Sequence, residues 1–253
     1  MSAAPSAEAM PQDAAQGRGS GVARALPFAL YIGFLAAVPA LREALPAGWD
    51  GRWLYAVQIA VTILALAWFA QAYQELRPPA LGRRAALEAA AAGIAVFVLW
   101  INLDFSWAML GAPGAGFDSR TPSGDIDWGL ATVRLFGAAA VVPIMEELFW
   151  RSFILRWIDN HDFLRLPAAA ASRRALLLSS IVFGLEHHLW LAGILAGLAY
   201  GSLYMRSGKL WSPILAHAVT NLLLGLWVLA TGAWVSGSRT KRKGCGCDGK
   251  RIQ

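Results

Sequence analysis

Charged residues are scarce in this sequence. Asp, Glu, Lys and Arg make up 15% of the 253 residues, whereas hydrophobic residues make up 57%. A soluble domain carries about 25% charged and roughly 45–50% apolar residues. The composition therefore excludes an ordinary soluble domain and indicates a polytopic membrane protein.

Cysteine is almost absent. Cys245 and Cys247 are the only two, and they lie in a Gly-rich stretch near the end of the chain. Because the chain ends in Arg-Ile-Gln, they do not form a prenylation box, and they do not indicate a redox compartment.

Positive charge is concentrated in the last residues. The net charge is +6, and six cations cluster there: Arg239, Lys241, Arg242, Lys243, Lys250 and Arg251. Such a cluster favours contact with anionic lipid headgroups. Nucleic acid is not expected as a partner, because the rest of the chain offers no basic folded face.

Seven apolar runs are candidates for membrane helices. They cover about residues 25–41, 53–73, 85–103, 128–155, 175–187, 190–205 and 213–234. We expect an all-α fold, a transmembrane helical bundle of about seven to eight spans around an intramembrane polar cavity. It forms a single domain, residues 23–235, between a disordered tail (1–22) and a basic C-terminal tail (236–253). As a helix, the fourth run would be about 42 Å long, which is longer than the ~30 Å thickness of the hydrocarbon core. We therefore expect it to tilt, to kink at Pro143 or to project from the membrane.

Loop charges predict the orientation. The arginine-rich segments 77–84, 165–174 and 206–209 fall on one side, which should be cytoplasmic, and the acidic loop Asp104–Asp127 falls on the other. Seven spans then place the basic C-terminal tail on the non-cytoplasmic side, against the rule. Either one run does not span, or an eighth crossing is hidden, for which the fourth run is a candidate.

Two adjacent glutamates end the apolar stretch that leads to Met145. Glu147 and Arg151 are four residues apart, so on a helix they share a face and can pair. Glu146 is rotated by about 100° from Glu147 and has no such partner. Ionisable groups inside a membrane are costly and indicate function.

Two histidines and an asparagine add to this set. His187 ends the fifth run, with Glu186 and His188 beside it, and His217 precedes Asn221 by four residues in the seventh. Each has a structural alternative, as an ion pair, a helix–helix hydrogen bond or an interfacial histidine. Together they fit hydrolysis: a carboxylate in a low-dielectric pocket takes a proton from water. Imidazoles bind a divalent metal or stabilise an oxyanion, although an HExxH motif is absent.

Three motifs in order resemble one family. Glu146-Glu147-Leu-Phe-Trp-Arg151 matches EExxxR, Phe183-Gly-Leu-Glu-His187 matches FxxxH, and His217-Ala-Val-Thr-Asn221 matches HxxxN. The set, over residues 127–234, resembles the CPBP family of intramembrane proteases, which includes the CAAX prenyl endopeptidases of the Rce1 type and bacterial Abi proteins. The surroundings of the histidines resemble the bacterial branch linked to exosortase systems.

The resemblance implies a helical bundle with a cavity open to the membrane and cytosol. Glu146 would be the general base, Glu147 and Arg151 would order the site, and His187 and His217 would hold a metal or the oxyanion, assisted by Asn221. Whether zinc, held by Glu146, His187 and His217, takes part is left open. The expected substrate is a membrane-anchored protein or peptide that is cut near the surface of the bilayer. The membrane itself is expected to be the inner membrane of a bacterium.

Two other functions compete with the protease. A non-catalytic scaffold or immunity-type protein that binds a partner would keep the polar cluster to hold helices together. A transporter would use the same groups to relay protons, but the sequence shows no inverted repeat.

Overall fold

The computed structural model describes residues 10–79, 81–111 and 117–233. These residues form helices and connecting turns, with a single isolated bridge between Arg120 and Ile126 in place of any strand. The helices are α1 (Met10–Glu43), α2 (Leu54–Trp68), α3 (Arg83–Asn102), α4 (Trp128–Phe136), α5 (Val142–Glu147), α6 (Leu155–Trp157), α7 (Arg173–Leu185), α8 (Trp190–Ser207) and α9 (Trp211–Thr231). The predicted all-α class is confirmed.

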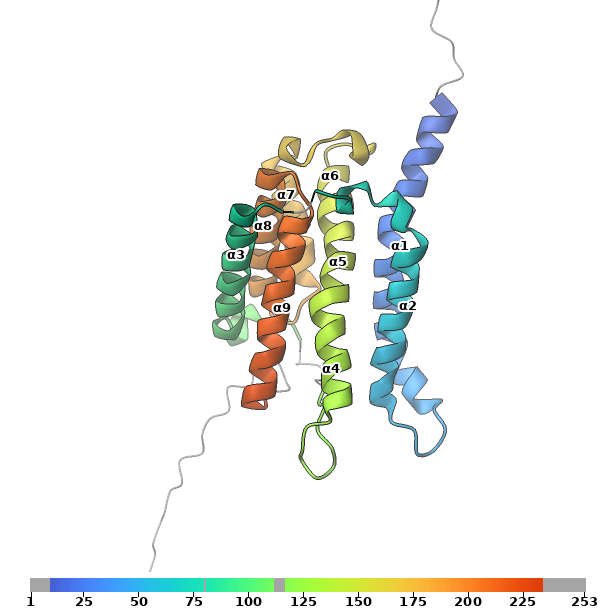
Figure 1. Cartoon of the computed structure of the whole chain (residues 1–253), viewed down its shortest axis with the longest axis vertical. Coiled ribbons are helices and arrows are strands. Elements are labelled where there is room, and N and C mark those ends of the chain that lie inside the picture. Colours follow the sequence, from blue (N-terminus) through green and yellow to red (C-terminus); the bar gives the residue numbers. More distant parts are fainter. Residues whose placement is uncertain (1–9, 80, 112–116, 234–253) are drawn as a thin grey trace, which may run out of the picture.

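The long helices run side by side in alternating directions (Figure 1). Five helical runs are long and apolar enough to cross a membrane: Gly19–Glu43, Gly51–Trp68, Arg83–Asn102, Trp128–Trp157 and Trp211–Thr231. Between the last two lie α7 and α8, an antiparallel hairpin of 13 and 18 residues. Residues 128–157 form one continuous pass, so the fourth run does not contain an eighth crossing.

The first helix begins earlier than predicted. Residues 10–22, expected to be part of a disordered tail, are the first turns of α1. A membrane span is already a helical nucleus, and extending a helix costs much less free energy than starting one. Composition alone missed this extension. The predicted basic tail, residues 236–253, lies outside the described residues.

The long fourth pass changes its winding around the two glutamates. The segments Gly137–Val141 and Leu148–Ile154 are π-helical, and α5 lies between them. Proline has no N–H, so Pro143 leaves a carbonyl of the preceding turn without its helical partner. This explains the first wide turn, which occurs where a kink at Pro143 was expected. The glutamate pair ends the short α-helical piece.

Small residues bring the surrounding helices close together. A Cβ on Gly93 of α3 would lie 2.3 Å from the carbonyl oxygen of Ala216 on α9. A Cβ on Gly193 or Gly197 of α8 would meet the α7 backbone at Gly184 or Ser180, at 2.8 and 2.9 Å. The four-residue glycine spacing in α8 therefore serves helix packing.

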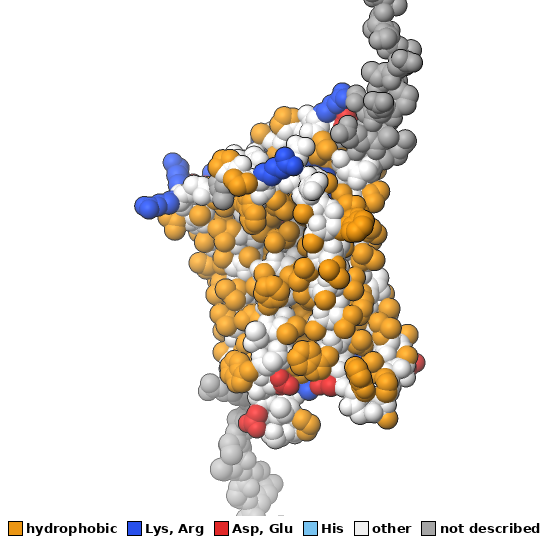
Figure 2. Space-filling view, turned by 45° about the vertical axis from the view of Figure 1, so that its right-hand side comes forward, with side chains coloured by type: hydrophobic (Ala, Val, Ile, Leu, Met, Phe, Trp, Pro, Cys, Tyr) orange, Lys and Arg blue, Asp and Glu red, His pale blue; other side chains and the backbone are white. Residues whose placement is uncertain are grey.

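The two ends of the bundle differ in charge. In Figure 2, blue Lys and Arg side chains lie at one end and red Asp and Glu side chains gather at the other. At the basic end, a buried ion network joins the first helices to the fourth pass. The fully buried Arg24 bonds both carboxylate oxygens of Glu75 (2.8 and 2.7 Å) and the Ser152 hydroxyl (3.0 Å). Arg156 donates to the same hydroxyl at 2.7 Å.

Candidate active site

Glu147 is the most enclosed carboxylate of the site. Its residue exposure is 0%. One oxygen lies 3.1 Å from Nε of Arg151, so the ion pair expected from the four-residue spacing is present across the π-helical turn. The other oxygen lies 2.9 Å from Nδ1 of His217 on α9. Glu147 therefore joins its own helix to α9.

The bond to Glu147 fixes the state of His217. A carboxylate only accepts hydrogen bonds, so Nδ1 of His217 carries the hydrogen, and in the neutral ring Nε2 has a lone pair. This Nε2 lies 4.0 Å from an Oε2 of Glu146. The ring also stacks on Tyr200 of α8, with centroids 5.1 Å apart and planes 19° apart. Two helices thus hold His217 with Nε2 toward Glu146.

Glu146 is held differently from its neighbour. It is buried, and its Oε2, like that of Glu147, has no hydrogen-bond partner among the described residues, but unlike Glu147 it forms no ion pair with an arginine there. It lines a cavity of about 300 Å³ together with His217. Of the two carboxylates, Glu146 is the one placed to accept a proton in the cavity, because the Glu147 carboxylate already contacts Arg151 and His217.

His187 reaches the same cavity from the turn after α7. Its Nδ1 lies 2.8 Å from the carbonyl oxygen of Phe183, and its ring meets Trp100 edge to face, with centroids 5.3 Å apart. A carbonyl accepts, so Nδ1 of this histidine also carries the hydrogen. Its neighbours Glu186 and His188 are not among the cavity-lining residues, and His188 instead bonds the Leu110 carbonyl at 2.6 Å.

Asn221 completes the set from α9. Its amide nitrogen donates to the carbonyl oxygen of Ala138 at 2.8 Å. In the i→i−5 pattern of the π-helical turn, the partner of that carbonyl would be residue 143, a proline without an N–H. Asn221 therefore satisfies the acceptor that Pro143 leaves open, and the second N–H of its amide is not needed there.

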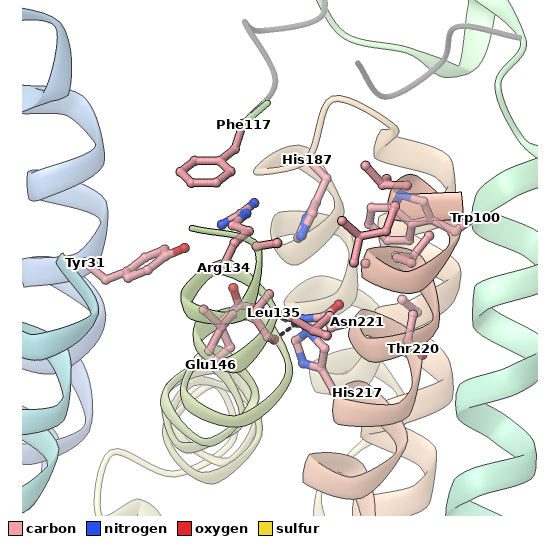
Figure 3. Close-up of a pocket in the computed structure, with 18 of the residues that line it drawn as sticks. Tyr31, Trp100, Phe117, Arg134, Leu135, Glu146, His187, His217, Thr220 and Asn221 are labelled. Atoms are coloured by element: carbon pink, nitrogen blue, oxygen red, sulfur yellow. Dashed lines mark hydrogen bonds and ion pairs between the residues drawn. The ribbon is translucent and has the colours of Figure 1, made fainter. Parts of the chain in front are cut away.

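The cavity brings the predicted residues together. Glu146, His187, His217 and Asn221 all line it, and Figure 3 shows them converging from the fourth pass, the α7 turn and α9. Glu147 and Arg151 lie behind this surface. The guanidinium carbon of Arg151 lies 4.3 Å from the centre of the Phe183 ring, which covers the buried ion pair.

Tyr31, Arg134 and Tyr200 are among the residues of this cavity that sequence analysis missed. Arg134 had a signal in the sequence, because it is one of only two cations, with Arg151, inside the apolar run of residues 128–155. The tyrosines had none, since aromatic residues are common in membrane helices. In Figure 3, Tyr31 reaches in from α1 with its hydroxyl toward Arg134 and Glu146.

The expected metal ligands are not gathered into a metal site. Among the described residues, no group of three or more His, Cys, Asp or Glu side chains is placed to hold a metal ion. The donor types would suit zinc, because Nε2 of each histidine carries a lone pair in the neutral ring, but only Glu146 and His217 approach each other, at 4.0 Å. The residues as placed do not fit the metal, and no step below uses one.

Fold and site together define a polytopic membrane protein with a glutamate–histidine site enclosed among its helices. Residues 128–223 match the sequence model of a protein family described as type II CAAX prenyl endopeptidase Rce1-like. The match supports the resemblance of this part of the chain to the CPBP family of CAAX-type intramembrane proteases, which the three motifs predicted. No curated protein and no solved structure matches the chain.

Proposed function

We propose that the protein is an intramembrane endopeptidase in which Glu146 activates water. The observation that carries the proposal is the contrast between the two glutamates. Glu147 is paired with Arg151 and His217 and is not among the residues that line the cavity, whereas Glu146 lines the cavity and pairs with no arginine of the described residues. A general base needs this freedom and must reach the proton that it removes.

The geometry supports a specific order of events. A water between Glu146 and Nε2 of His217 would donate hydrogen bonds to both, because both atoms are acceptors. Glu146 takes one proton as the oxygen attacks the peptide carbonyl, and the C–N bond breaks as the same proton passes to the leaving amine. The second amide hydrogen of Asn221 is the donor available to the oxyanion. His187 adds a donor only when Nε2 is protonated.

The proposed substrate is a membrane-anchored protein or peptide, since the cavity lies among membrane helices. The matched family is named for prenylated proteins, and a lipid-modified segment is one form of such an anchor. The proposed location is the inner membrane of a bacterium, and the exosortase-linked branch stays a prediction. The alternative is a non-catalytic protein that binds a partner.

The test is cleavage by purified protein in nanodiscs. A library of lipid-anchored peptides is incubated with the wild type and with Glu146→Gln, and the metal content of both samples is measured. Cleavage by the wild type alone supports the proposal. Stoichiometric zinc in the active sample would support a metal-dependent reaction, whereas cleavage without metal supports the mechanism above. If the folded wild-type protein cleaves none of the peptides, the result favours the alternative, a non-catalytic protein that binds a partner.

A further inference from the structure

A second hollow lies at the basic end of the bundle and shares no lining residue with the candidate active site. Its volume is about 460 Å³, and its walls come from the start of α3, the end of α8 and the start of α9. Three arginines line it, Arg83, Arg84 and Arg206, together with one carboxylate, that of Glu88. We call it the basic hollow.

The charges of the basic hollow do not balance. Glu88 is shared between two of the arginines: one oxygen lies 3.1 Å from Nε of Arg84, and the other lies 3.8 Å from the guanidinium of Arg206. Arg83 forms no ion pair with a described residue. One carboxylate cannot neutralise three guanidinium groups, so the hollow keeps a net positive charge that favours an anion.

The start of α3 adds backbone donors to this charge. Its N-cap residue, Gly82, has no side chain that could accept a hydrogen bond, and Ala86 is the residue whose N–H reaches the Gly82 carbonyl, at 3.0 Å. The N–H groups before Ala86 have no acceptor inside the helix. An uncapped helix start of this kind is suited to an anion, because the N–H groups and the helix dipole both favour negative charge.

Helix α7 provides a comparison at the same end of the bundle, where α3, α7 and α9 all begin (Figure 1). It starts with the same Arg-Arg pair, Arg173 and Arg174. Its N-cap residue is Ser172, whose hydroxyl accepts a hydrogen bond from the Ala175 N–H at 3.0 Å. The chain therefore caps one of two similar helix starts with its own side chain and leaves the other open to the basic hollow.

A buried hydroxyl points to a ligand independently of the helix start. Ser212, in the first turn of α9, lines the basic hollow and is only 2% exposed, yet it forms no hydrogen bond with another described residue. A buried polar group without a partner costs free energy. A ligand with acceptor oxygens that fills the hollow would remove this cost.

The basic hollow lies where two membrane spans begin. The spans Arg83–Asn102 and Trp211–Thr231 both start beside it, which is the level of the lipid headgroups. Leu87 follows Arg83 by four residues on the same face of α3 and is 71% exposed. Cations and then apolar surface match the order of groups in a phospholipid, whose phosphate is followed by acyl chains.

We propose that the basic hollow binds the phosphate group of an anionic phospholipid. Basic pockets between membrane helices are suited to such headgroups. The guanidinium groups of Arg83 and Arg206 bind phosphate oxygens, the Ser212 hydroxyl donates one hydrogen bond, and the acyl chains lie along the face of α3 that carries Leu87. This site is separate from the proposed proteolytic site and does not depend on it.

Lipid binding to the purified full-length protein tests the proposal. The protein is titrated in detergent with phosphatidylglycerol or phosphatidylcholine, and bound lipid is measured by native mass spectrometry. Both lipids carry a phosphate, but only phosphatidylglycerol has a net negative charge. The double variant Arg83→Gln, Arg206→Gln should raise the Kd for phosphatidylglycerol about 10- to 30-fold, and Ser212→Ala should raise it roughly 3- to 10-fold.

Two control variants separate the basic hollow from general charge. Arg173→Gln with Arg174→Gln removes the same charge from the capped start of α7 and should change the Kd by less than about 2-fold. Glu88→Gln removes the competing carboxylate and should lower the Kd about 5-fold, a gain that a folding defect would not produce. The six cations that follow residue 233 also attract anionic lipid, so the same differences are expected in a background where all six are glutamine.

Three results would overturn the proposal. Equal losses in the two double variants would show that binding follows overall charge. Equal affinity for the two lipids would show that the hollow does not select an anion. Displacement of phosphatidylglycerol by inorganic phosphate at the same concentration would assign the hollow to a soluble anion. Because no readout involves cleavage, the lipid site and the protease proposal can fail separately.

Discussion

The adjacent glutamates should respond in opposite ways to the same substitution. Glu146→Gln removes a carboxylate that pairs with no arginine of the described residues and lies 4.0 Å from His217, so the free energy of unfolding should change by less than about 1 kcal/mol. Cleavage should fall by about 10²–10⁴-fold, because the proton acceptor is lost. Glu147→Gln removes the charge that faces the buried guanidinium of Arg151 at 3.1 Å.

The cost of the second substitution follows from burial. An uncompensated buried charge lowers the free energy of unfolding by about 3–5 kcal/mol. At about 2–4 °C per kcal/mol for a chain of this size, Tm should fall by roughly 6–20 °C. Glu88→Gln is the matched control, since Glu88 also pairs with an arginine four residues away, Arg84 at 3.1 Å, but is 43% exposed. Its effect should stay within about 1 kcal/mol.

The assay is thermal unfolding in one detergent, followed by cleavage of the best library peptide at a temperature where all four proteins are folded. The reasoning would be refuted if Glu147→Gln kept the wild-type Tm, because Arg151 would then not depend on its partner. It would also be refuted if folded Glu146→Gln cleaved at the wild-type rate, since another group would then have to be the base.

Three further outcomes are expected. Tyr200→Phe loses a 2.7 Å hydroxyl bond and should lower the free energy of unfolding by about 1 kcal/mol, measured by thermal unfolding. Gly93→Val brings a side chain against the Ala216 carbonyl and should cost about 1–3 kcal/mol; an unchanged Tm would contradict the close contact. Burial opposes ionisation of Glu75, but its hydrogen bonds with Arg24 hold its pKa below the usual value, so its contribution is present above about pH 4.3 and is lost as pH falls through the lowered pKa. The stability difference between wild type and Glu75→Gln should therefore shrink toward pH 3; a constant difference would contradict the pairing.

Local spacing was sufficient for part of the site. Four residues separate Glu147 from Arg151, and helix geometry alone predicts their contact. The link from Glu147 to His217 was not predictable, because it depends on how α9 is rotated against the fourth pass. The stacking of Tyr200 on His217 depends in the same way on α8.

The π-helical turns show another limit of sequence patterns. Pro143 indicated a disturbance in the fourth pass, and a kink was the simplest expectation. Whether a helix bends or widens depends on the groups that satisfy its freed carbonyls, and here Asn221 on a distant part of the chain satisfies one of them. Asn221 was predicted as a catalytic helper from its motif, and its structural bond to Ala138 emerged only from the packing.

The walls of the cavity reach well beyond the stretch that the family shares. Tyr31 and Trp100 contribute from α1 and α3, which precede residue 128, and Val228 and Leu229 contribute from beyond residue 223. A fragment cut to the family boundaries would leave the catalytic groups facing acyl chains on the side where α1 and α3 now stand. The smallest unit able to keep water beside Glu146 is therefore the whole bundle, and swapping the outer helices between relatives should change which segments are admitted while the chemistry stays the same.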